Sequence, residues 1–288
     1  MSPLYPIPYF SPAESLPAPL PSTEEIEAQA ELRPKHFPCQ YVVRAGEHFC
    51  VKYGWLVRPI EGHNMLYVRI KTGISVPRVY AIYQQEDAKG RQCTYIVMEY
   101  IDGQTLGECW STLDLKVKEA IASQLHDFLG QLRRLPPPDG FGSLDNGPLY
   151  DGLFLTEEEQ PKINGPFKTE DDIAEALVLK LEHEDDNFPA ERASFYRHVL
   201  PRVLQGDGKS RFTHTDWQTK NIMLRPDGTV VILDWQTVGW YPRYWEYAAT
   251  LFGCGLWADD FHAWVPKFLD EYPNEYLWLA NIRTFLWF

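Results

Sequence analysis

The sequence predicts an α+β fold in which a small antiparallel sheet with one helix precedes a mostly helical region. Three observations lead to this prediction: strand-like runs between residues 40 and 101, helical periodicity after residue 103, and a hairpin near residue 230. With 288 residues, the chain can bury a sizeable core as one large domain or as two lobes. We therefore divide it into an arm, a first lobe and a second lobe. The divisions are residues 1–22, 23–101 and 103–288.

The first residues differ in composition from the rest. Residues 1–22 contain seven prolines without regular periodicity, which is typical of an extended or partly disordered arm. Ser22 and Glu25 then have the spacing of a capping box, which predicts a short acidic helix that ends near Leu32.

Alternating apolar residues define the first lobe. Strands are expected at 41–44 and 48–53, joined by a tight turn at Gly46. A helix over residues 61–71 follows. Two more strands are expected at 78–84 and 94–100. The order strand, strand, helix, strand, strand predicts a small antiparallel sheet with one helix.

Helical spacing dominates the second lobe. Apolar residues recur through 117–135 until three prolines end the helix. Residues 139–168 lack periodicity and predict a long loop, whereas Thr169 before three acidic residues predicts a helix start. A helix over 190–204 and three terminal helical segments complete the lobe.

The region Phe212 to Gln236 contains the hairpin. Apolar runs at 222–224 and 230–233 flank Pro226-Asp227-Gly228, which is turn chemistry between two strands. The hairpin is expected to carry three oxygen-bearing side chains near one end. These are Asp216, Asn221 and Asp234.

Composition excludes several classes of protein. A net charge of −13 argues against a broad nucleic-acid footprint, and no apolar run approaches the roughly 20 residues that span a bilayer. Residues 1–32 contain no Lys or Arg, so they do not resemble a secretory signal or a transit peptide. Five scattered cysteines without CxxC spacing indicate free thiols in a reducing cytoplasm.

Residues 151–186 hold twelve Asp or Glu against three Lys. One interpretation is a solvated helical surface. The other is a wall of a site for a cationic substrate.

The hairpin region also contains two motifs. H-x-D-x-x-x-x-N covers residues 214–221, and Asp234-Trp235-Gln236 follows the hairpin. Together with W-Y-P-x-Y-W-E-Y at 240–247, these motifs resemble the aminoglycoside phosphotransferase and choline kinase superfamily, in particular fungal members of uncertain substrate. The resemblance covers residues 40–250 and implies a two-lobed protein-kinase-like fold.

The resemblance implies a nucleotide site in the first lobe. Lys52 would contact the α- and β-phosphates of ATP, and Glu61 would be its ion-pair partner. Backbone groups of the hinge residues Glu99, Tyr100 and Ile101 would hydrogen-bond adenine. As structural alternatives, Lys52 is an ordinary strand-end lysine and Glu61 a first-turn acid.

The second lobe would supply the chemistry. Asp216 would accept or orient the proton of the attacking hydroxyl, while Asn221 and Asp234 would bind Mg²⁺. The implied acceptor is a hydroxyl of a small molecule, and the acidic segment favours a cationic one. No A-P-E segment follows Asp234, which disfavours protein phosphorylation. A non-catalytic nucleotide-binding scaffold is the alternative function, and the oligomeric state is open.

Some residues depart from the family pattern or allow two interpretations. Thr215, Trp217 and Gln236 stand where many relatives have Gly, Leu and Glu. The aromatic residues around the motifs could form a substrate wall that holds a cation, or they could pack in the core. These residues are Trp217, Trp235, Trp240, Tyr244 and Trp245.

Overall fold

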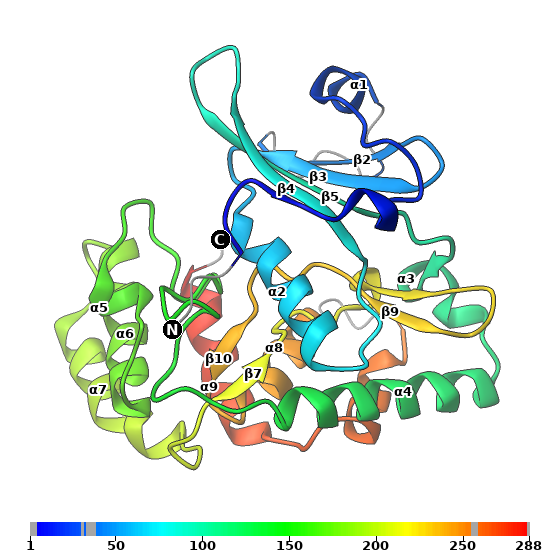
Figure 1. Ribbon diagram of the computed structural model, residues 1–288. Coiled ribbons are helices and arrows are strands. Elements are labelled where there is room, and N and C mark those ends of the chain that lie inside the picture. Colours follow the sequence, from blue (N-terminus) through cyan, green and yellow to red (C-terminus); the bar gives the residue numbers. More distant parts are fainter. Residues whose placement is uncertain (1–4, 30–31, 33–38, 255–258, 287–288) are drawn as a thin grey trace. The chain divides into compact units, whose positions relative to one another are not determined.

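The computed structural model describes residues 5–29, 32, 39–254 and 259–286 (Figure 1). The chain forms two compact units. Unit 1 consists of Met1–Gln104 with Met223–Gln236, and unit 2 of Thr105–Ile222 with Thr237–Phe288. Within the described ranges, we find no helix with the length and apolar composition that crossing a membrane requires.

Unit 1 is built on a five-stranded sheet in the order β1-β4-β5-β3-β2. The strands are β1 (Tyr9–Phe10), β2 (Tyr41–Ala45), β3 (Phe49–Gly54), β4 (Val79–Glu86) and β5 (Gln92–Glu99). All of its pairings are antiparallel. The helices α1 (Thr23–Glu27) and α2 (Pro59–Lys71) lie on opposite faces of this sheet (Figure 1). The predicted sheet with its helix is thus confirmed.

The arm contributes to this sheet. After a 3-10 turn at Ala13–Ser15 the chain runs along the sheet face, where Leu16 and Leu20 pack on the core around Ile26. Before that turn, β1 pairs with β4 and extends the sheet by one strand. The capping box of Ser22 and Glu25 is present, but the prediction that α1 ends near Leu32 is wrong, since α1 ends at Glu27.

One aromatic residue from each strand joins a ladder across the same face of the sheet. Ring centroids are separated by 6.2, 4.9, 5.3 and 5.0 Å along the ladder. Its members, in order, are Phe10, Tyr83, Tyr95, Tyr53 and Tyr41. Because neighbouring strands place cross-strand partners about 5 Å apart, a single register error would break the ladder.

The predicted hairpin is confirmed. Its strands are β8 (Ile222–Leu224) and β9 (Val230–Ile232), and β6 (Gln104–Thr105) completes a three-stranded sheet. Gly228 closes the turn with a φ of 84°, a conformation that glycine adopts without steric cost.

Unit 2 is mostly helical, as predicted. Its α-helices are α3 (Leu106–Cys109), α4 (Leu115–Arg133), α5 (Pro161–Asn164), α6 (Glu170–Glu184), α7 (Ala190–Val203), α8 (Trp245–Gly253) and α9 (Pro273–Leu286). Strands β7 (Arg211–Thr213) and β10 (Gly239–Tyr241) form a two-stranded sheet, and 3-10 turns occur at Trp110–Thr112, Thr219–Asn221 and Phe261–Lys267. The Thr169 cap of α6 is present as a capping box. The long segment 139–168 is irregular except for α5.

The core of unit 2 packs α6, α7, α8 and α9 together with the irregular segment. Trp245 is fully buried between Phe154 and Tyr241, and its indole N–H donates to Asp151. The other aromatic residues considered for a substrate wall are also buried, with exposed fractions of at most 4%. The interpretation that these five residues pack in the core is therefore correct, and the interpretation that they form an aromatic substrate wall is wrong.

Several residues of the acidic segment have structural partners. Glu175 and Glu182 both bind Arg197, and Asp151 binds the buried Arg283. Glu170 accepts from the backbone N–H groups of Gly206 and Gly208. A part of the segment therefore stabilises unit 2 itself. All five cysteines are free thiols, as expected.

Candidate active site

Lys52 lies in the middle of β3. Because successive side chains of a strand point to opposite faces of the sheet, its position in the strand decides which face it occupies. Its neighbour Val51 packs in the core beneath the arm, so Lys52 faces the opposite side of the sheet. The side chain is almost fully buried. A buried ammonium needs anionic partners, because burial alone costs several kcal/mol.

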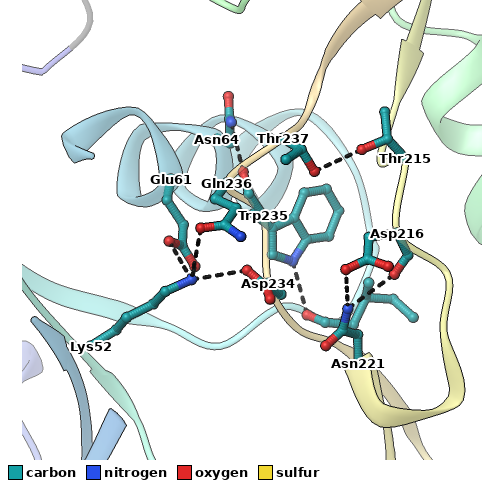
Figure 2. Close-up of polar contacts among 11 residues, drawn as sticks. Lys52, Glu61, Asn64, Thr215, Asp216, Asn221, Asp234, Trp235, Gln236 and Thr237 are labelled. Carbon is teal, nitrogen blue, oxygen red and sulfur yellow. Dashed lines mark hydrogen bonds and ion pairs between the residues drawn. The ribbon is translucent and has the colours of Figure 1, made fainter. Parts of the chain in front are cut away.

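Glu61 is the first of these partners. It lies in the first turn of α2, and Nζ of Lys52 is 2.9 Å from its Oε1 and 2.8 Å from its Oε2 (Figure 2). Gly62 lets the helix approach the sheet this closely, since a Cβ there would be 2.5 Å from Cδ1 of Ile82. Gly62 therefore allows α2 to lie close enough to the sheet for Glu61 to contact Lys52.

Asp234 is the second partner. Its Oδ1 is 2.9 Å from Nζ of Lys52, and Oε1 of Gln236 is 3.5 Å from the same nitrogen. Asp234 has a φ of 63°, which is uncommon outside glycine. Nδ2 of Asn64 donates a 2.8 Å bond to the carbonyl of Trp235 and so ties this backbone to α2. We call Lys52, Glu61, Asp234 and Gln236 the lysine cluster.

Two carboxylates surround one ammonium in the lysine cluster. Burial lowers the pKa of Lys52, but the nearby charges of Asp234 and Glu61 outweigh it and raise that pKa above its ordinary value. Lys52 thus remains protonated at neutral pH. With Lys52 protonated and both carboxylates ionised, the three side chains would sum to one negative charge. Asp234 is the most exposed of these three, at 16% of its side chain.

In unit 2, the loop 214–221 follows β7. Thr215 has a φ of 71°, and for a β-branched residue this is strained backbone. Three bonds hold it there. The carboxylate of Glu246 accepts from the N–H of His214 at 3.0 Å and from that of Thr215 at 2.8 Å. Figure 2 shows the third bond, which Oγ1 of Thr215 donates to Oγ1 of Thr237 at 2.7 Å.

The strained turn presents Asp216. Its N–H donates to Nδ1 of the buried His214 at 3.3 Å, so His214 braces the loop. Nδ2 of Asn221 donates to Oδ2 of Asp216 at 2.7 Å, and Nε2 of Gln218 donates to Oδ1. These bonds orient the carboxylate, as a general base must be oriented before it can accept a proton.

Asn221 has a further property that points to a ligand. Its Oδ1 is buried, and no hydrogen-bond donor among the described residues contacts it. Because its Nδ2 is held by Asp216, the amide cannot rotate to satisfy the oxygen without losing that bond. Amide and carboxylate oxygens are the ligands that Mg²⁺ prefers. The oxygen donor at Asn221 in unit 2 and the one at Asp234 in unit 1 are each of the type that suits a magnesium ion.

The predicted hinge lies at the end of β5. The N–H of Glu99 donates to the carbonyl of Arg78 and that of Tyr100 to the carbonyl of His48, so sheet contacts occupy both. Among described residues, the N–H of Ile101 has no hydrogen-bond partner. Ile101 thus retains the donor that adenine recognition would need, and this role stays a prediction.

Three further residues shape the site and are not among those predicted from the sequence. Glu246 holds the loop backbone, Asn64 holds the backbone at Trp235, and Thr237 bonds Thr215. Glu246 belongs to the W-Y-P-x-Y-W-E-Y motif, and this motif is the sequence feature from which a role for Glu246 could have been predicted. No local pattern marks Asn64 or Thr237.

The model of the phosphotransferase enzyme family matches residues 59–287. No match to a curated protein sequence is found.

Solved structures of similar fold include two aminoglycoside phosphotransferases and a choline kinase. A ternary complex of a thermostable mutant of APH(4)-Ia with AMP-PNP and hygromycin B is 15% identical, with 91% of this chain and 83% of that chain covered and a TM-score of 0.57. The GDP and kanamycin complex of APH(2")-IIia is 15% identical, with 91% and 82% covered and a TM-score of 0.52. Choline kinase LicA from Streptococcus pneumoniae is 14% identical, with 89% and 82% covered and a TM-score of 0.49. At such identities the likeness of the first two establishes the two-lobed kinase-like fold alone.

Proposed function

Because the chain belongs to the phosphotransferase enzyme family, we propose that it transfers the γ-phosphoryl group of ATP to a hydroxyl of a small molecule with the help of Mg²⁺. The observation that carries this proposal is the buried Oδ1 of Asn221 beside an oriented Asp216. The proposal keeps residues 23–101 as the nucleotide-binding lobe and 103–288 as the catalytic lobe.

The lysine cluster has the chemistry that a nucleotide phosphate needs. Lys52 would contact the phosphates as a point charge, and Glu61 would keep that charge in place, as their 2.8 Å contact supports. A bound magnesium ion would reduce the charge repulsion of the phosphates and stabilise the transition state electrostatically. Asp234 and Asn221 are the residues proposed to hold it.

Asp216 is the proposed catalytic residue. Its carboxylate would accept the proton of the acceptor hydroxyl or orient that hydroxyl for attack. The bonds from Asn221 and Gln218 support this role because they restrict the carboxylate to one orientation. Adenine would be bound by the hinge backbone of residues 99–101, with the N–H of Ile101 as the available donor.

A nucleotide titration combined with a turnover screen tests this function. Purified protein is incubated with ATP, Mg²⁺ and a metabolite extract, and new phosphorylated products are identified by mass spectrometry. We expect thermal stabilisation by ATP with Mg²⁺ and at least one product that Asp216→Asn does not form. Loss of the general base costs about 100- to 10,000-fold in rate.

The same variant separates an enzyme from a nucleotide-binding scaffold. If wild type binds ATP but yields no product that depends on Asp216, the chain is a scaffold and the proposed transfer is wrong. If a correctly folded protein binds no nucleotide, both functions are wrong.

We further propose that the acceptor is cationic. Several residues of segment 151–186, including Glu157 and Glu158, form no ion pair with any described residue. Two of the similar solved structures are complexes with hygromycin B and with kanamycin. Attraction between unlike charges weakens with salt. The KM of the identified acceptor should therefore rise with ionic strength, and a KM independent of salt would contradict this part.

A further inference from the structure

Unit 2 contains a cavity of about 300 Å³ that none of the proposed catalytic residues lines. Its wall comes from α4, the start of β7, α8 with the segment before it, and residues 268–272. Three arginines line it: Arg133, Arg211 and Arg243. Leu129, Phe268 and two tyrosines supply an apolar part. This volume lies at the small end of the range for small-molecule sites.

Three arginines in one cavity are unusual in a chain with a net charge of −13. Burial lowers the pKa of Arg133, Glu246 opposes this effect, and the like charge of Arg211 adds to it. The guanidinium groups of Arg133 and Arg211 are therefore close enough to repel each other. An anion between them would relieve that repulsion.

The guanidinium groups still have donors to offer. Nε of Arg243 donates to the hydroxyl of Tyr272, but in the part of the chain that the structure describes its two terminal nitrogens have no partner. Arg211 uses its terminal nitrogens for Asp207 and the carbonyl of Ser210, and its Nε has no partner there either. Guanidinium groups with open donors recognise phosphate and carboxylate oxygens with high geometric specificity.

The acidic neighbours limit the choice of ligand. Asp270 lines the cavity, Asp207 pairs with Arg211, and Glu246 lies 3.9 Å from Nη2 of Arg133. These carboxylates would repel an anion that approached them directly. The hydroxyl of Tyr272 and, after it, Asp207 and Asp270 raise the pKa of Arg243, but among the described residues no carboxylate contacts its terminal nitrogens. Arg243 would therefore make the first contact with an anion.

We propose that this cavity binds a small oxyanion, as phosphate or as a phosphate or carboxylate group of a metabolite, with Arg243 as the principal ligand and Arg211 and Arg133 as supporting ones. The tyrosines and the apolar wall leave room for a small organic part next to the anionic group. This site goes beyond the proposed transfer reaction, and its existence does not depend on that reaction.

The cavity is linked to the loop that presents Asp216. Nη1 of Arg133 donates to the carbonyl of Phe212 at 3.2 Å, directly before the loop, and Nη2 faces Glu246, which accepts from the N–H groups of His214 and Thr215. An anion that draws Arg133 toward the cavity would weaken its hold on Glu246. Occupancy would then alter the backbone hydrogen bonds of His214 and Thr215.

Isothermal titration with inorganic phosphate and, separately, with malonate tests the binding site. We expect saturable binding of at least one anion in wild type and an affinity at least about tenfold lower in Arg243→Gln and in Arg211→Gln. Phosphate binding alone would indicate a phosphate ligand, and malonate binding as well would extend the class to carboxylates. Arg202→Gln, an exposed arginine on α7, should bind as wild type does.

Phosphate could also occupy the proposed nucleotide site, so Lys52→Gln is measured in parallel and should retain the cavity affinity. The site does not exist if no anion saturates the protein up to about 10 mM, or if Lys52→Gln abolishes binding while Arg243→Gln preserves it. Circular dichroism confirms that each variant is folded.

Hydrogen exchange reads out the link to the loop. On addition of the bound anion, the exchange rates of the His214 and Thr215 amides should change in wild type and not in Arg243→Gln. Unchanged rates in wild type at saturation would show that the site and the loop are independent.

Discussion

The backbone N–H of Thr215 donates a 2.8 Å hydrogen bond to Oε1 of Glu246, and it does so from a left-handed conformation with a φ of 71°. The two residues are 31 positions apart, so the bond closes a long loop around the motif that contains Asp216. Glu246 is fully buried, so its charge depends on these backbone donors and on the more distant Arg133. The Glu246 carboxylate therefore stabilises the strained backbone at Thr215, and the backbone N–H groups of His214 and Thr215 in turn provide the buried carboxylate with hydrogen bonds.

We predict that Glu246→Gln lowers the free energy of unfolding by about 2–3 kcal/mol, because two charge-assisted hydrogen bonds are replaced by one neutral bond and one mismatched contact. Turnover should fall by about 100-fold as Asp216 loses its position. Urea unfolding and steady-state kinetics measure the two effects. The control is Glu271→Gln, an exposed position where neither should change. Wild-type turnover in Glu246→Gln would show that this carboxylate does not position the loop.

Thr215 tests the strain directly. Thr215→Gly removes the steric cost of positive φ, about 1–3 kcal/mol, but also removes the bond to Thr237, whereas Thr215→Ala loses the bond and keeps much of the strain. We therefore expect the glycine variant to be more stable than the alanine variant by about 1 kcal/mol in urea unfolding. The reverse order would mean that the left-handed backbone costs little here.

Lys52→Met should destabilise the fold by about 3–5 kcal/mol, since it removes the ammonium that the buried Glu61 and the partly buried Asp234 both contact. The folded-state pKa of Lys52 is raised, so its stabilising contribution is complete below the unfolded pKa and is lost only as pH rises through the higher folded value. The difference between wild type and variant should thus be equal at about pH 8 and about pH 9.5 and shrink above about pH 11.

Chemical denaturation at these pH values measures the difference. Lys267→Met, at an exposed lysine, is the matched control and should show no such pH dependence. A difference that already shrinks below about pH 9 would indicate that burial, not the two carboxylates, dominates the pKa of Lys52.

Gly62→Ala should be destabilising by about 1–3 kcal/mol because its Cβ would lie 2.5 Å from the fully buried Ile82. The helix must move away from the sheet, which also separates Glu61 from Lys52 and should weaken ATP binding. Gly130→Ala offers a matched helical glycine whose Cβ meets only ordinary contacts, and it should stabilise by about 0.5–1 kcal/mol. Equal effects of both substitutions would contradict a close approach at Gly62.

Tyr95→Phe tests how the arm is held. The hydroxyl of Tyr95 donates a 2.5 Å bond to Oε1 of Glu27 on α1, and burial followed by this carboxylate raises its pKa, so it remains a donor at ordinary pH. Loss of the bond should cost about 1.5–3 kcal/mol and increase hydrogen exchange in α1. Tyr41→Phe is the control in the same ladder and should leave α1 exchange unchanged.

Local patterns in the sequence determined most of the elements and their order. Turn residues and two-residue alternation predicted β2, β3, β4, β5 and the hairpin, and capping boxes predicted the starts of α1 and α6. The motif spacing also placed Asp216, Asn221 and Asp234 on two segments next to one hairpin. These features depend on neighbours within a few residues, and such interactions can be read from the chain itself.

Only the tertiary structure decided contacts between distant residues. β1 has two residues, too few for a pattern, and it exists because β4 offers an edge with which it can pair. The buried aromatic residues 217, 235, 240, 244 and 245 could equally have lined a surface, since hydrophobic patterning does not distinguish a core from a concave wall. The bond from Thr215 to Glu246 and the three arginines of one cavity join separate segments of unit 2. Such pairings depend on where the chain returns in space, which no local propensity encodes.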